Sequence, residues 1–225
     1  QVELALMRSG EHEVARAYVL YREKRAKERQ QKDTKPPSED SHELKISIDG
    51  ELKPLDKQFF LEIVNSACSD YKDLVNPSDI LDAAFKNIYD GIQFEEVFKS
   101  LILSARTLIE KDPAYAKVSA QLLLYSIRKE VLGHDVQTCE MQKIYEEYFP
   151  RFIEKGITKN LLDPELAKFD ITKLSSNIVS SRDHKFDYLG IQTLYDRYFL
   201  IDRKDKVNKE GRRLELPQIF FMRVA

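Results

Sequence analysis

The sequence predicts a mainly α-helical fold with one small β-hairpin. Apolar residues recur every three or four positions over most of the chain after residue 55, as they do on the buried face of a helix. Apolar and polar residues alternate as in a strand around residues 44–48, and Asp49-Gly50, a typical turn pair, follows directly. With 225 residues, of which 42% are hydrophobic and 33% charged, the chain can form one substantial core and a second small unit.

A helix is predicted near the beginning of the chain. Val14, Tyr18 and Tyr21 lie on one helical face, and Ser9 is a suitable N-cap. Apolar residues then disappear, and Pro36-Pro37 prevents a helix from continuing. We therefore expect a linker over residues 26–42.

Residues 43–133 are predicted to form a helical domain that begins with the hairpin. Leu44, Ile46 and Ile48 mark the first strand, and Leu52 continues an edge strand that Pro54 ends. Four helices follow: one with Phe59, Phe60, Ile63 and Val64; one with Ile80, Leu81, Ala84 and Ile88, opened by Pro77 and closed by Gly91; one with Val97, Leu101, Ile102, Ala105, Leu108 and Ile109, ended by Asp112-Pro113; and one from Tyr115 to Val131, capped by Gly133. The last two helices should form the core.

Residues 134–225 continue as helices and turns. Tyr188, Ile191, Leu194, Tyr195 and Tyr198 share one helical face. A charged stretch between Arg203 and Arg213, with Gly211, predicts a surface hairpin loop. In the run from Leu216 to Ala225, we expect Ile219, Phe220, Phe221 and Val224 to need a partner surface that buries them, so that the chain reads as a piece of a longer protein.

Several kinds of chemistry are missing from the sequence. The net charge of -2 does not suit a nucleic-acid-binding protein, and no apolar run is long enough for a membrane span, which leaves the cytoplasm as the expected location. Cys68 and Cys139 lie too far apart for a zinc motif, and the scattered glycines form no phosphate-binding loop. The histidines, His12, His42, His134 and His184, form no HExxH motif. From the residues alone, the chain reads as a helical regulatory or structural region without catalytic or metal-binding residues.

Three stretches carry motifs that periodicity does not explain. The first is QVELALMRSG, residues 1–10, with ARAYVLYREKR, residues 15–25. The second is YDGI, residues 89–92, with LIEKDPAY, residues 108–115, and Leu122-Leu123-Leu124 leading into Arg128-Lys129. The third is YLGIQTLYDRYFL, residues 188–200, with LPQIFFMRVA, residues 216–225. In this order they resemble the closing part of an ATP-cone, the N-terminal helical region, and the approach to the ten-stranded α/β barrel in the large subunit of class I ribonucleotide reductases.

The resemblance implies a division of the chain and a parent enzyme. Residues 1–25 would be the end of an ATP-cone, 26–42 a linker, 43–133 a cone-like helical domain, and 134–225 a region leading into the catalytic barrel. The parent would reduce ribonucleoside diphosphates to deoxyribonucleotides by a cysteine thiyl radical, started by a metal-containing small subunit. It would be a homodimer or higher oligomer, with ATP, dATP and other nucleotides as effectors and a thioredoxin-type protein as reductant. The family's catalytic cysteines match no position here, so this chain alone is expected to be inactive.

The resemblance also supplies candidate nucleotide-binding residues. In the first cone, Tyr21, Arg22 and Arg25 match the positions on the last helix that would contact base and phosphates. The hairpin and first helices of that cone would precede Gln1, so the site would be incomplete.

The unit over residues 44–131 resembles a second, degenerate cone. Ser47 and Ile48 stand where nucleotide-binding cones carry Lys-Arg, a pair that meets phosphate charge. Phe94 and Phe98 replace a hydroxyl and an imidazole, which leaves Lys129 as the lone matching cation. We expect this unit to be structural. An alternative for the whole chain is a free-standing, non-catalytic helical regulatory or interaction module.

Overall fold

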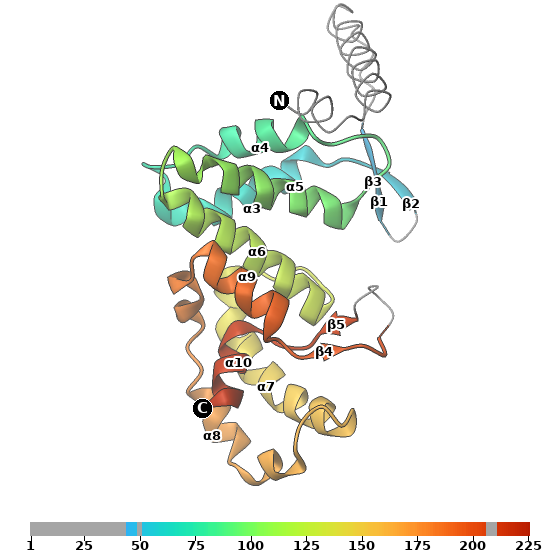
Figure 1. Ribbon diagram of the computed structural model, residues 1–225, viewed down its shortest axis with the longest axis vertical. Coiled ribbons are helices and arrows are strands. Elements are labelled where there is room, and N and C mark those ends of the chain that lie inside the picture. Colours follow the sequence, from blue (N-terminus) through green and yellow to red (C-terminus); the bar gives the residue numbers. More distant parts are fainter. Residues whose placement is uncertain (1–43, 49–50, 206–210) are drawn as a thin grey trace, which may run out of the picture. The chain divides into compact units, whose positions relative to one another are not determined.

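A computed structural model describes residues 44–48, 51–205 and 211–225. The predicted first helix within residues 1–25 and the linker over 26–42 lie outside the described residues. The region from Leu44 to Ala225 forms one compact unit. It is mainly helical with a small sheet, as the sequence predicts (Figure 1).

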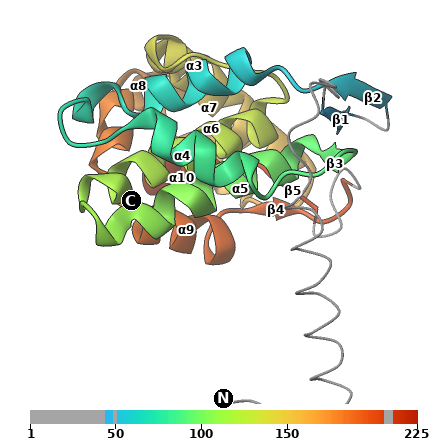
Figure 2. The same cartoon turned by 90° about the horizontal axis from the view of Figure 1, so that it is seen from above.

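The predicted hairpin is confirmed, and a further strand joins it. β1 (Lys45–Ile48) pairs antiparallel with β2 (Glu51–Pro54), which is the exposed edge of the sheet. β3 (Ile92–Gln93) pairs parallel with β1 on its other side (Figure 2). Gly91 has a φ of 81° and donates a backbone hydrogen bond of 2.8 Å to the carbonyl of Lys45. Gly91 therefore positions β3, and its prediction as the end of a helix is wrong.

The first group of helices follows the predicted order. It comprises α3 (Lys57–Ala67), α4 (Pro77–Phe85), α5 (Phe94–Thr107) and α6 (Ala114–Leu132), with 3-10 turns at Ser69–Tyr71 and Leu108–Glu110. Asp56 and Asn76 cap α3 and α4 by accepting backbone hydrogen bonds of 3.1 Å. Gly133, with a φ of 82°, ends α6 as predicted. Ile88 lies beyond the end of α4, and Leu108 and Ile109 continue α5 only as a 3-10 turn.

The second group of elements begins after a 3-10 turn at Thr138–Glu140. It comprises α7 (Met141–Thr158), a 3-10 helix at Pro164–Lys168, α8 (Ile171–Ser176), a 3-10 helix at Ser180–Lys185, α9 (Tyr188–Arg197), β4 (Ile201–Asp202), β5 (Arg212–Arg213) and α10 (Pro217–Val224). α7 runs through Pro150, because buried aromatic residues on both sides, Phe149 and Phe152, hold it against the core. β4 and β5 pair antiparallel and confirm the predicted hairpin around Gly211.

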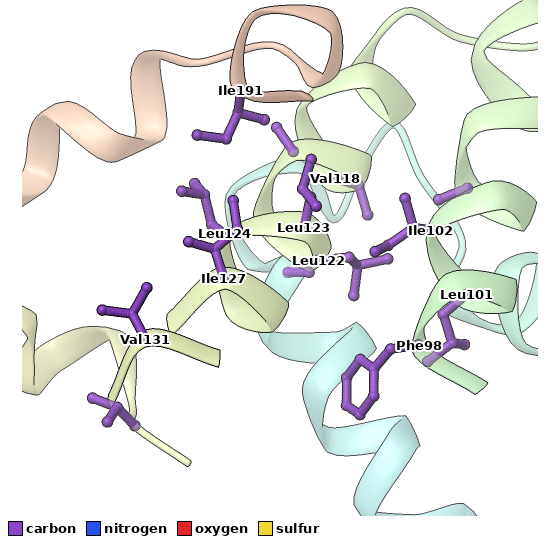
Figure 3. Packing of buried hydrophobic residues seen from close by; sticks show 14 of the residues in the cluster. Phe98, Leu101, Ile102, Val118, Leu122, Leu123, Leu124, Ile127, Val131 and Ile191 are labelled. Carbon is purple, nitrogen blue, oxygen red and sulfur yellow. The ribbon is translucent and has the colours of Figure 1, made fainter. Parts of the chain in front are cut away.

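The core is continuous and is centred on α6. This helix packs against α3 and α5 on one side and against α9 on another. Figure 3 shows Leu122, Leu124 and Ile127 of α6 packed among side chains of α5 and Ile191 of α9. The prediction that α5 and α6 form the core is confirmed, and the core extends further than predicted.

The C-terminal helix α10 is partly buried within this chain. Ile219 is 0% exposed and Phe220 9%, so the expectation that both need an outside partner is wrong. Phe220 packs against Phe199, with ring centroids 5.9 Å apart. Only Phe221 and Val224, 45% and 61% exposed, remain available from the predicted set.

Candidate functional site

The nucleotide-binding residues predicted in the first cone, Tyr21, Arg22 and Arg25, lie outside the described residues. The candidate site that can be described is the groove of the cone-like unit. This groove has a volume of about 1210 Å³ and lies between the hairpin, α5, α6 and β5. The hairpin and helix positions that the family resemblance singles out, Ile48, Phe94, Phe98 and Lys129, line this groove.

The walls of the groove near the hairpin are apolar. Ile46 and Ile48 of β1 and Phe94 and Phe98 of α5 line it. The rings of Phe94 and Phe98 are 5.1 Å apart and both side chains are buried in the core. Ser47, the other position where a binding cone carries a cation, is itself buried and does not line the groove. These positions therefore supply neither a cation nor a donor for a phosphate.

Lys129, the remaining candidate cation, is held by partners within the chain. Its ammonium group lies 3.9 Å from the centre of the Phe94 ring and 3.1 Å from Oδ1 of Asp135. Tyr125 donates a hydrogen bond of 2.5 Å to the same carboxylate, and burial together with Asp135 raises the pKa of Tyr125. The Phe94 ring and the Asp135 carboxylate thus both lie directly against the ammonium group of Lys129.

Two arginines at the far edge of the groove bind the end of α6. Arg212 donates hydrogen bonds of 2.7 and 3.2 Å to the carbonyls of Glu130 and Val131. The guanidinium of Arg213 lies 3.5 Å from the centre of the Tyr195 ring, and its Nη1 lies 3.6 Å from the Glu130 carboxylate. Both arginines therefore fasten β5 to the last turn of α6, where carbonyls lack helical partners.

The two cysteines differ in environment. Cys68 is buried at the end of α3, and burial raises the pKa of its thiol to about 11. Cys139 is exposed. The structure does not bring either into a group of metal ligands, and over the described ranges no cluster of three or more His, Cys, Asp or Glu side chains could hold a metal ion.

The two histidines in the described part of the chain, His134 and His184, each contact a different group. Nδ1 of His184 lies 3.4 Å from Asp70, and Nδ1 of His134 lies 3.2 Å from the carbonyl of Leu132. His12 and His42 lie outside the described residues. Among the helices that the structure describes, none is long and apolar enough to cross a membrane.

A buried polar cluster was not predicted from the sequence. Asp183, which is 0% exposed, accepts hydrogen bonds of 2.8 Å from the Tyr145 hydroxyl and from the Gln218 amide. Nη2 of Arg128 lies 3.3 Å from the same carboxylate. Burial, and then the charge of Asp183, raises the pKa of Tyr145 well above its usual value. We call these four side chains the Asp183 cluster.

The Asp183 cluster joins four elements of the fold. Arg128 belongs to α6, Tyr145 to α7, Asp183 to the 3-10 helix before α9, and Gln218 to α10. Arg128 and Asp183 are 55 positions apart, and although Arg128 belongs to the second of the three sequence stretches, nothing in the sequence connects it with Asp183. Only the folded chain brings them together, which is why sequence reasoning missed them.

In the groove and the Asp183 cluster, Lys129, Arg212, Arg213 and Arg128 each contact side chains or carbonyls of this chain. No family model matches the chain. Its whole length is 40% identical to the ribonucleoside-diphosphate reductase subunit alpha of Chlamydia muridarum and 38% identical to that of Chlamydia trachomatis, and it spans 21% of each of those proteins. Over 80% of the chain, it is 35% identical to the same subunit of Helicobacter pylori, again over 21% of that protein.

These relatives settle the family. The chain belongs to the ribonucleoside-diphosphate reductase large (alpha) subunits, as an N-terminal part of about one fifth of their length. The resemblance in the three sequence motifs is thereby confirmed at the level of the family.

Proposed function

We propose that this chain is the N-terminal scaffold of a large subunit that reduces ribonucleoside diphosphates to deoxyribonucleotides. The observation that carries the proposal is the likeness over the whole chain to subunits of that name. The same likeness argues against a free-standing helical interaction module. In this proposal the chain is cytoplasmic and is followed by the ten-stranded catalytic barrel.

The partners in this proposal come from the family. The large subunit forms a homodimer or higher oligomer and receives a radical from a metal-containing small subunit. A thioredoxin-type reductant returns it to its reduced state. ATP and dATP act as effectors through the cone to which Tyr21, Arg22 and Arg25 belong. The region over residues 44–131, with a cone-like order of hairpin and helices, has a structural role.

The burial of Cys68 supports placing the thiol chemistry elsewhere in the large subunit, whereas Cys139 is left to the assay below. Cys68 is buried with a raised pKa, and Cys139 lies at the surface in the 3-10 turn before α7. Thiol chemistry depends on accessible thiolate, which Cys68 does not offer. We therefore assign this chain the tasks of supporting the catalytic domain and transmitting the allosteric state.

A reductase assay tests the proposal. Deoxyribonucleotide formation is measured with the large subunit that contains this chain, together with its small subunit and a dithiol. We expect product from that mixture and none when residues 1–225 replace the large subunit. Product from residues 1–225 that is lost on Cys139→Ser would contradict the placement of the active site, and no product from the complete subunit would contradict the assigned reaction.

A further inference from the structure

Positively charged side chains gather where the β4–β5 hairpin meets α7. Figure 1 shows the hairpin beside the second half of this helix. The Tyr148 hydroxyl of α7 donates a hydrogen bond of 3.0 Å to the carbonyl of Leu214, directly after β5. Lys159 of α7 forms an ion pair with Asp202 of β4. The hairpin is therefore held against the face of α7 that carries Tyr148 and Lys159.

Lys155 lies on this same face of α7. It comes two helical turns after Tyr148 and one turn before Lys159, so the three side chains follow one stripe along the helix. Lys155 is half-buried, and within the described part of the chain its ammonium group has neither a hydrogen bond nor an ion pair. Lys155 thus faces the hairpin without an anionic partner.

Arg212 brings a second positive charge to this place. It stands opposite Asp202 in the pairing of β5 with β4, and residues directly opposite each other lie on the same face of a strand pair. Its Nε and Nη2 donate to the carbonyls at the end of α6, whereas Nη1 has no hydrogen-bond partner among the described residues. One donor group of this guanidinium is therefore available to a ligand.

The carboxylates nearby do not compensate both cations. Asp202 is bound by Lys159 and also accepts a hydrogen bond of 3.1 Å from the backbone N–H of Lys204, and Asp205 has a contact of its own. Burial, and then the charges of Arg212 and Lys159, lower the pKa of Lys155, while Asp202 and Asp205 oppose this with smaller effects. The surroundings of Lys155 therefore favour an additional negative group.

We propose that Lys155 and Arg212 together bind a phosphate group. The N–H groups of an arginine match the oxygens of phosphate, and a lysine adds a point charge. The bound phosphate joins β5 to α7 beside the pair of Lys159 with Asp202. This site shares only Arg212 with the groove, and it is independent of the reaction assigned to the large subunit.

Acetylation of lysines in the chain of residues 1–225 tests the site. An N-hydroxysuccinimide ester acetylates the amines, and mass spectrometry of the peptides gives the rate at each lysine. Inorganic phosphate at about 10 mM should slow acetylation of Lys155 about two- to fivefold relative to sodium chloride of equal ionic strength, as for a dissociation constant of a few millimolar. Lys143, whose side chain is 81% exposed on α7, should not respond.

AMP at the same concentration separates the two sources of a phosphate group. Protection of Lys155 by AMP, with or without protection by inorganic phosphate, assigns the phosphate of a nucleotide to the site. Protection by inorganic phosphate alone assigns the free anion. If neither compound slows acetylation of Lys155 relative to chloride, the proposal is overturned.

Paired variants show whether phosphate acts through Lys155. Phosphate should raise the melting temperature of the native chain and of Lys143→Gln relative to chloride, because a ligand of the folded state stabilises it, and should not raise that of Lys155→Gln. Circular dichroism checks that Lys155→Gln folds, which we expect since the change removes a half-buried charge without an anionic partner. An equal rise in both variants would place the bound phosphate elsewhere, and the proposal would fail.

Discussion

At the scale of single residues, a few buried polar side chains hold the elements after residue 133 together. The carboxylate of Asp183 meets a guanidinium, a hydroxyl and an amide that come from different elements. A buried charge is tolerated only when it is paired and hydrogen-bonded, and removal of one partner leaves the other charge uncompensated. Within the described residues, Nε of Arg128 has no hydrogen-bond partner, and Nη1 donates only a long hydrogen bond of 3.4 Å to the Thr138 hydroxyl.

We predict that Asp183→Ala strongly destabilises the chain. The loss should be about 3–5 kcal/mol, because the guanidinium of Arg128 would stay buried without its counter-charge. Asp183→Asn should cost less, since an amide can still accept a hydrogen bond from Tyr145. Urea denaturation, monitored by circular dichroism, measures both.

An exposed ion pair provides the control for this prediction. Asp187 lies 2.7 Å from Lys117 but is largely exposed, so Asp187→Ala should cost at most about 1 kcal/mol. Equal losses for Asp183→Ala and Asp187→Ala would show that the Asp183 cluster does not hold the fold together.

At the scale of elements, local sequence signals predicted the helices and the first hairpin well. The pairing of segments that are distant in the sequence was not predicted. Alternation and Asp-Gly predicted the β1–β2 hairpin, and helical periodicity predicted α3, α5 and α6. β3 was missed because a strand of 2 residues has no pattern, and its partner β1 is far away in the sequence. The burial of Ile219 was missed for a similar reason, since its neighbours in space come from elsewhere in the chain.

The groove of the cone-like unit yields the next prediction. Calorimetry should detect no binding of ATP or dATP that depends on Lys129, because Phe94 and Asp135 already occupy the space around its ammonium group. The full chain also contains Arg25, which the family resemblance assigns to a different cone. Any heat signal should therefore disappear in Arg25→Ala and persist in Lys129→Ala.

The opposite pattern would restore the cone-like unit as a nucleotide site. A saturable signal that Lys129→Ala abolishes and Arg25→Ala leaves intact would mean that Phe94 moves aside for the ligand. For the candidate site, the sequence allowed only one prediction, that the cone-like unit lacks the residues for nucleotide binding. At Ile48 and Phe98 the sequence shows that the cation and the imidazole of a nucleotide-binding cone are missing. The partners of Lys129 become apparent only in the folded chain.

At the scale of the whole unit from Leu44 to Ala225, α6 connects the two groups of helices. Its buried residues are distributed around the helix and not along one stripe: Tyr115, Val118, Ser119, Ala120, Leu122, Leu123, Leu124, Ile127, Arg128 and Val131. A helix that is apolar on most sides is typical of the interior of a larger domain. The predicted boundary at residue 133 stays a prediction, and buried hydrophobic residues of the core lie on both sides of it.

The last prediction follows from this shared helix. Leu124 is fully buried and lies in the part of α6 near Ile127 and Ile191 (Figure 3). Leu124→Ala should lower the free energy of unfolding by about 2–5 kcal/mol, while Leu103→Ala, at an exposed position of α5, should change it little. Because α6 packs against both groups, hydrogen exchange should speed up in α5 and in α7 together, and a single transition should remain. If α5 keeps its protection while α7 loses it, then the two groups unfold separately and α6 belongs to one of them only.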